Sequence, residues 1–161
     1  MAYLSDILLW IAAISAGLMA GVFFTFSAFV MRSLDAIKAP AGMLAMQSIN
    51  RIIVKSSFLP IFFVSTIACA VLVVIAALDL GAAGAIWTLS GSAAYVVGMF
   101  VVTIAGNVPL NNRLEATPAD GQEGAEMWAE YLRKWMIWNH VRTIACTGSL
   151  ILLVLAIAER L

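Results

Sequence analysis

The chain has 161 residues, of which 63% are hydrophobic and 11% are charged, and its nine basic and nine acidic side chains leave no formal net charge. The mean hydropathy of +1.01 is well above that of soluble domains and indicates an integral membrane protein. The balanced charge, without a basic stripe interleaved with aromatic residues, argues against a nucleic-acid partner.

Four apolar stretches are long enough to cross a bilayer, which takes about 20 residues of helix. There are 25 uncharged residues between Asp6 and Arg32, 23 between Lys55 and Asp79, and 33 between Asp79 and Arg113. With the C-terminal apolar run, they predict transmembrane helices at residues 7–31, 57–78, 84–107 and 135–158. We therefore predict an all-α membrane four-helix bundle that forms one domain over residues 1–161, with the lipid bilayer around it.

The basic residues are distributed unevenly between the loops. Four lie in or beside the loop between the first two spans, four in or beside the loop between the last two, and only Arg160 lies on the other side. Cytoplasmic loops carry an excess of Lys and Arg. We therefore expect a multi-pass protein of the cell membrane, with both termini outward and both long loops cytoplasmic.

The first span combines a stripe of small residues with a group of phenylalanines. The small residues recur every four positions and allow a neighbouring helix, or a second copy in a homo-oligomer, to approach closely. They are Ala13, Gly17, Gly21 and Thr25. The aromatic group near the end of the span is Phe23, Phe24, Phe26 and Phe29. We interpret it as a lipid-facing and core-filling girdle in preference to a ligand-stacking wall.

The first long loop has the spacing of a helix. Apolar residues recur with helical period after Pro40, so we expect a helix that begins near Ala41 and continues into the second span. Asn50 lies on its polar side. Pro60 should either kink this helix or mark a break near Phe58.

The third span ends in a polar cluster that contains Asn107 and Asn111. Pro109 disfavours helical geometry in the residue before it, so the span is expected to close at about Asn107. Because the third span ends on the side of the membrane where the fourth begins, both asparagines lie on the same side as the segment around His140. They are therefore candidates for a site on that face.

An amphipathic helix is predicted between the third and fourth spans, at about residues 118–134. Thr117 and Pro118 carry helix-start signals. An apolar stripe and an acidic stripe then follow on opposite faces, so we expect this helix to lie along the cytoplasmic membrane surface. The apolar stripe is Trp128, Tyr131, Leu132 and Trp135. One of the carboxylates opposite it is a candidate partner for Arg142.

The fourth span begins with polar residues at an unusual depth. The uncharged run of residues 143–158 makes only about 24 Å of helix at ~1.5 Å per residue, which is less than the ~30 Å hydrocarbon core. The helix must recruit residues upstream, which places Asn139, His140 and Arg142 at or just inside the hydrocarbon edge. Polar groups at this depth tend to be functional or firmly paired.

A helical wheel divides these polar residues between faces. At about 100° per residue, Asn139 and Thr143 share one face, whereas His140 and Arg142 lie roughly 160° apart. We infer that one of these last two serves a site and the other a neighbouring helix or a lipid headgroup.

Two motifs carry a family resemblance. One is Asn107-x-Pro109-Leu110-Asn111, and the other is Trp128-x-x-Tyr131-x-x-x-Trp135-x-x-Trp138-Asn139-His140-x-Arg142-Thr143, with Ser27, Met31 and Asn50 upstream. Through them, and over nearly its whole length, the chain resembles the anthrone oxygenase-like family of small four-helix membrane proteins, many of which are filed as a domain of unknown function. The resemblance implies that some relatives oxidise anthrones to anthraquinones with molecular oxygen and without a metal or flavin.

On that resemblance we hypothesise a cofactor-free oxygenase that acts on a hydrophobic, anthrone-like aromatic molecule at a cytoplasmic-side site. His140 would be the base that removes a benzylic proton, and hydrogen-bond donors would hold the enolate oxygen. The candidate donors are Asn107, Asn111, Asn139 and Arg142. Trp135 and Trp138 would stack on the ring. Asn50, Thr143 and Ser27 are further candidate substrate-binding residues, and no metal site is expected.

Two other classes of protein remain open. One is a non-enzymatic membrane protein that binds a lipid or quinone, or serves as a subunit of a membrane complex. In the other, His140, Arg142 and the asparagines only satisfy helix ends.

Overall fold

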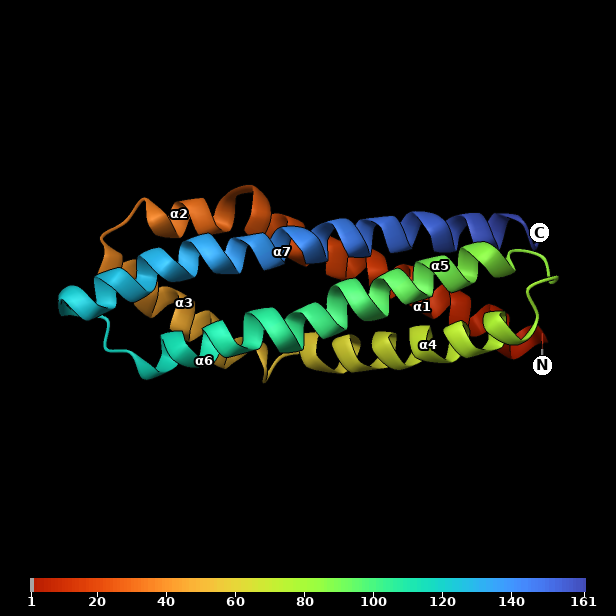
Figure 1. Ribbon diagram of the computed structural model, residues 1–161, viewed down its shortest axis with the longest axis horizontal. Helices are drawn as coiled ribbons and strands as arrows, with labels where there is room; N and C mark the ends of the chain where they lie inside the picture. The colour runs from red at the N-terminus through yellow and green to blue at the C-terminus, as the bar shows by residue number, and fades with distance from the viewer. Residues whose placement is uncertain (1) are drawn as a thin grey trace.

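The computed structural model describes residues 2–161, which form four long helices side by side (Figure 1). The first consists of α1 (Ala2–Thr25), the π-helical segment η1 (Phe26–Val30) and α2 (Met31–Asp35). A shorter helix, α3 (Ala39–Ile53), precedes the second, α4 (Phe58–Leu78). The third consists of α5 (Ala85–Tyr95), the π-helical segments η2 (Val96–Val101) and η3 (Thr103–Asn107), and α6 (Val108–Ala116). The fourth is α7 (Gly121–Ala158).

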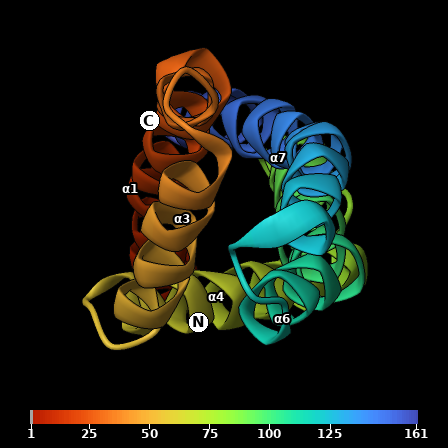
Figure 2. The same ribbon diagram turned by 90° about the vertical axis from the view of Figure 1, so that its left-hand side faces the viewer.

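The predicted fold class is confirmed. The described residues contain no strand, and four helices are long and apolar enough to cross a membrane. Both chain ends and the α4–α5 connection lie at one end of the bundle, here called the terminus end (Figure 1). The other end, here called the α3 end, holds α2, α3, α6 and the start of α7. Seen from the α3 end, the helices surround a common axis (Figure 2).

The additional interfacial helix expected at residues 118–134 is not confirmed. From Gly121 onward these residues belong to α7, which continues without a break into the fourth span. The apolar stripe that includes Trp128 and Tyr131 is buried against α3 and α6 instead of facing a membrane surface. The reason is that α3 and α6 extend the bundle beyond the apolar spans and offer this stripe a protein partner.

Two expected helix boundaries also differ. The third helix does not close at Asn107, because Pro109 falls in the first turn of α6, where its missing N–H matters little, directly after the π-helical segment η3. In the first long loop, α3 ends at Ile53 and does not continue into the second span. The chain breaks just before Phe58, as the alternative based on Pro60 predicted, and Pro60 occupies the first turn of α4.

The bundle has two packed cores. The larger one lies between α1, α4, α5 and α7 and reaches the terminus end. The smaller one closes the α3 end and contains Met43, Met46, Leu114, Trp128 and Tyr131, all of them buried. Gln47 ties α3 across this end, because its amide donates hydrogen bonds of 2.8 and 3.2 Å to the carbonyls of Leu114 and Thr117.

Candidate functional site

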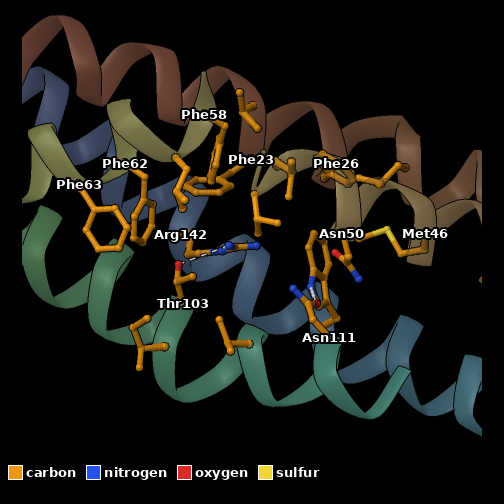
Figure 3. Close-up of a pocket in the computed structure, with 18 residues that line it drawn as sticks. Phe23, Phe26, Met46, Asn50, Phe58, Phe62, Phe63, Thr103, Asn111 and Arg142 are labelled. Carbon is orange, nitrogen blue, oxygen red and sulfur yellow. Dashed lines mark hydrogen bonds between the residues drawn. The ribbon is translucent and has the colours of Figure 1, made fainter. Parts of the chain in front are cut away.

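A cavity of about 170 Å³ lies in the bundle toward the α3 end (Figure 3). A single water needs only ~10–15 Å³, so the cavity has room for a small organic molecule. The wall is largely aromatic and aliphatic, with Phe23 and Phe26 on one side and Phe58, Phe62 and Phe63 from α4 on another. Its polar side chains are few, as in most sites for small ligands. They are Asn50, Thr103, Asn111, Trp135 and Arg142.

Arg142 is the one ionisable residue of the cavity lining, and its guanidinium projects into the middle of the labelled side chains (Figure 3). The residue is only 5% exposed. Its Cζ atom lies 4.2 Å from the ring centre of Phe23 and 5.2 Å from that of Trp135, so two aromatic faces hold the cation. Its Nη2 donates a 2.8 Å hydrogen bond to Asn139 Oδ1, and its Nη1 a long one of 3.4 Å to Thr103 Oγ1.

No carboxylate within residues 2–161 forms an ion pair with Arg142. Glu130, one of the acidic residues considered as its partner, is paired with Arg113 and Lys134 instead. Arginine has five N–H donors, and those of Arg142 make two hydrogen bonds in the structure; its buried Nε makes none. An unpaired buried charge is destabilising, and an ionisable residue inside a membrane span is by default a candidate for function.

Asn139 fixes the position of this guanidinium. The residue is fully buried, and its Nδ2 donates hydrogen bonds of 2.8 Å to the Phe23 carbonyl and 2.8 Å to Ser27 Oγ. A carbonyl can only accept, so the amide nitrogen must face α1 and the amide oxygen must face Arg142. The first and fourth helices together therefore set the direction of the arginine.

Ser27 lies at the centre of a polar cluster on the η1 side of α7. Besides Asn139, its hydroxyl contacts His140 Nδ1 at 2.9 Å and Thr143 Oγ1 at 3.1 Å. Thr143 Oγ1 also donates to the Asn139 carbonyl at 2.9 Å. The cluster connects His140 to Arg142 through Ser27 and Asn139.

His140 and Arg142 lie in different environments, in the manner that the helical wheel predicted. His140 is exposed on the outer face of α7 and does not line the cavity. Its hydrogen bond to Ser27, which does not line the cavity either, connects it to Arg142 only through Asn139. For His140 to act as a base on a molecule in the cavity, that molecule or the side chain would have to move.

Three of the asparagines outside α7 lie around Trp135 and the adjacent Tyr131. Asn111 Oδ1 accepts hydrogen bonds from Tyr131 Oη at 2.8 Å and Trp135 Nε1 at 2.9 Å, so its Nδ2 donors remain available at the cavity wall. Asn50 lines the same wall from α3, and its buried Nδ2 makes no hydrogen bond in the structure. Asn107 is buried behind Trp135, to whose carbonyl its Nδ2 donates at 3.4 Å.

The two tryptophans expected to stack on a ring have different surroundings. Trp135 lines the cavity and continues a ladder of stacked rings through Tyr131 to Trp128, with 5.9 Å between successive ring centres. Trp138 is 41% exposed, does not line the cavity and covers Gly106, where an added Cβ would lie 2.7 Å from the indole ring.

Two of the three π-helical segments border the cavity. η1 contributes Phe26, and η3 contributes Thr103 and Ile104. Single π-helical turns occur often at functional sites, because the wider turn redirects side chains. Here they bring an aromatic ring and the hydroxyl that contacts Arg142 to the same space.

Sequence reasoning missed the contributions of α4 and of Thr103. Phe58 and Phe62 lie one helical turn apart at the start of the second span, a spacing that places them on one face. Thr103 lies four residues before Asn107 and eight before Asn111 on the third helix. The structure also divides the phenylalanines of the first helix: Phe23 and Phe26 line the cavity, whereas Phe24 and Phe29 are exposed.

Comparison with protein families shows that residues 54–152 match the model of a family described as anthrone oxygenase. The matched region is more than half of the chain. It begins just before α4, includes Asn111, Trp135 and Arg142, and ends within α7. No curated protein and no solved structure matches the chain.

Proposed function

This chain belongs to the anthrone oxygenase family, and we propose that it oxidises a hydrophobic aromatic molecule of the anthrone type with O2 in the cavity beside Arg142. The observation that carries the proposal is the guanidinium of Arg142, which has no carboxylate partner and faces a largely apolar cavity. The family supports the class of substrate, and the cavity supplies a place for it.

The few polar groups of the cavity include hydrogen-bond donors that are not used within the protein. Arg142 and Asn111 both present N–H groups that have no acceptor in the structure, and no carboxylate lines the wall. A ligand that complements this wall carries an acceptor oxygen, preferably one on which negative charge develops. The enolate of an anthrone has this property, and its fused rings match the aromatic walls formed by Phe23 and Trp135.

The reaction needs no further protein group that changes its oxidation state. Loss of the benzylic proton to water gives an enolate, whose oxygen Arg142 stabilises; the benzylic carbon then bonds to O2, which takes up the electron pair and a proton to form a hydroperoxide. Loss of the second hydrogen from that carbon, with cleavage of the O–O bond, leaves a carbonyl and releases water. Anthrone and O2 thus give anthraquinone and water. In this scheme Arg142 lowers the pKa of the substrate C–H, and the cavity orients the ring.

The distribution of basic residues supports an orientation in the cell membrane with the α3 end in the cytoplasm. The site would then lie on the cytoplasmic side of the bilayer.

The function is tested with membranes that contain the protein, supplied with anthrone under air. We expect anthraquinone to form faster than in membranes without the protein, with one O2 consumed per quinone and no accumulation of hydrogen peroxide. Absorbance of the quinone and an oxygen electrode measure the two rates. Quinone formation at the spontaneous rate, while anthrone still quenches the tryptophan fluorescence of the protein, would instead identify a membrane protein that only binds such molecules.

His140→Ala tests whether the histidine acts directly. Two hydrogen bonds, through Ser27, connect it to Asn139. The variant loses the first of them, and a hydrogen bond is worth about 0.5–1.5 kcal/mol. We expect kcat to fall by roughly two- to tenfold, the equivalent of that free energy. Steady-state kinetics on anthrone measure the change. A loss of a hundredfold or more would assign the base function to His140 itself and require the substrate to reach the outer face of α7.

A further inference from the structure

The cavity lining changes from buried to exposed along one direction. Arg142 is almost completely buried, whereas three lining residues are about half exposed: Val54 at 52%, Phe63 at 47% and Ile104 at 50%. Val54 directly precedes the break before α4, Phe63 lies on α4 and Ile104 on η3. The cavity therefore opens sideways, between the start of α4 and η3.

The packing of the helices explains this opening. α4 packs closely along α5 and to a smaller extent along η2, where Phe62 and Phe63 meet Phe100 at ring-centre distances of 5.6 and 6.5 Å. This packing does not continue along η3. Beyond Phe100, the two helices therefore leave the side of the cavity uncovered.

In a bilayer, the α4 side of the opening would lie within the hydrocarbon layer. Phe63 is 16 residues before Asp79, and Arg142 is 17 residues before Glu159. At ~1.5 Å per residue both are about 25 Å from the charged residues at the terminus end, so they lie several Å inside a ~30 Å core. Apart from Arg142, no residue of the lining is ionisable. Phe63 and Ile104 are thus placed to face lipid chains, whereas Val54, which directly precedes Lys55, lies at the membrane edge of the opening.

The route to water at the α3 end is closed. The smaller core fills that end with buried side chains such as Met46, Trp128 and Tyr131. Gln47 and the ion pair between Arg51 and Glu115, with an N–O distance of 2.7 Å, connect α3 to α6 there. A molecule arriving from the aqueous phase would have to displace this packing.

We propose that the substrate enters from the bilayer, through a lateral portal bounded by Val54, Phe63 and Ile104, with its oxygen-bearing end leading toward Arg142. The proposal deepens the proposed function and rests on it for the nature of the occupant, an uncharged aromatic ketone dissolved in the membrane. An apolar substituent on the far side of the ring then projects into the portal and the lipid. Substrates that carry such a substituent are accepted, and charged water-soluble ones are excluded.

The experiment measures how fast anthrone binds, under argon, so that its readout does not depend on oxidation. The protein is reconstituted in phosphatidylcholine–phosphatidylglycerol vesicles, and stopped-flow quenching of tryptophan fluorescence follows binding. Ile104→Trp narrows the portal. Ile86→Trp is its matched control, since Ile86 is 64% exposed on α5 of the same long helix, lies outside the cavity lining and adds the same fluorophore. Phe63→Ala widens the portal.

We expect Ile104→Trp to slow both association and dissociation about tenfold, because a rate change of this size corresponds to ~1.4 kcal/mol at the barrier. Phe63→Ala accelerates both rates, and Ile86→Trp changes neither. Rates that are unaffected by Ile104→Trp and Phe63→Ala overturn the portal, as does faster binding in Gln47→Ala, which would place the entrance at the α3 end. The absence of anthrone binding to the wild-type protein also overturns the portal proposal.

Failure of the proposed oxidation has a different signature. If the binding rates change in the portal variants but no quinone forms in air, lateral entry is supported and the oxygenase proposal is wrong. If quinone forms at the same rate in the wild type and in the rim variants, the oxygenase proposal stands and lateral entry is wrong.

Discussion

Replacing Arg142 with methionine is expected to lower kcat for anthrone oxidation by about 10²- to 10³-fold, the range found when a single oxyanion-stabilising donor is removed. The guanidinium is the one ionisable group of the cavity lining and has no carboxylate partner. Its charge is therefore available to an enolate. Methionine retains the approximate length of the side chain and its contacts with Phe23 and Trp135 but removes the charge and every donor.

The variant should remain folded. Loss of the hydrogen bond to Asn139 destabilises the protein, but removal of an unpaired buried charge offsets this effect. Thermal unfolding in detergent measures the balance. Arg142→Lys keeps the charge without the planar fork and should retain intermediate activity.

Arg113→Met is the matched control for Arg142→Met. Arg113 is more than half exposed, and its ion pair with Glu130 is of the surface kind that contributes about 0–1 kcal/mol. Its kcat should equal that of the wild type. If Arg142→Met itself retains kcat within threefold of the wild type, the guanidinium does not stabilise the reacting oxygen, and the proposed site is wrong.

Asn139→Asp is expected to reduce kcat by roughly 10- to 100-fold, the equivalent of one to two steps of ~1.4 kcal/mol. The aspartate is nearly isosteric, and one of its oxygens would lie 2.8 Å from Arg142 Nη2. An ion pair at this distance neutralises much of the positive charge of Arg142 and so weakens its electrostatic stabilisation of the enolate. Asn139 thus acts through Arg142, as a positioning residue.

The same variant should also be less stable. Its second oxygen replaces the amide nitrogen that donates to the Phe23 carbonyl at 2.8 Å, so two acceptors face each other. Loss of a buried hydrogen bond of this kind is destabilising by about 1–3 kcal/mol, partly offset by the new ion pair. Thermal unfolding should therefore show a lower Tm.

A measurement of affinity separates the charge effect from simple loss of structure. Neutral anthraquinone should bind Asn139→Asp within about threefold of the wild-type Kd, since only the anionic enolate depends on the free charge. Asn112→Asp is the matched control, an exposed asparagine next to Asn111. A parallel loss of quinone affinity and kcat would show that Asn139 merely maintains the fold.

Hydropathy was sufficient to predict four helices that are long and apolar enough to cross a membrane, because a bilayer requires a minimum length of apolar helix whatever its neighbours are. It failed where a protein neighbour replaced the expected solvent or lipid. The stripe of Trp128 and Tyr131 has the same pattern whether it contacts a membrane surface or another helix. Only the presence of α3 and α6 decides that it is buried. Likewise, Pro109 indicates a helix end, but the π-helical turn before it lets the helix continue.

The properties of the site likewise fall into those that the sequence predicts and those that depend on packing between helices. The sequence by itself predicted that Asn139, His140 and Arg142 lie at or just inside the hydrocarbon edge and separated the last two by helical angle, since both predictions follow from counting residues along one helix. The tertiary structure alone decided that Arg142 faces the cavity without a carboxylate, that Asn139 holds it through the Phe23 carbonyl, and that His140 is exposed. It also decided that part of the wall comes from α4 and η3 and that the cavity has half-exposed residues between them. These properties depend on contacts between helices far apart in the chain, which local periodicity does not encode.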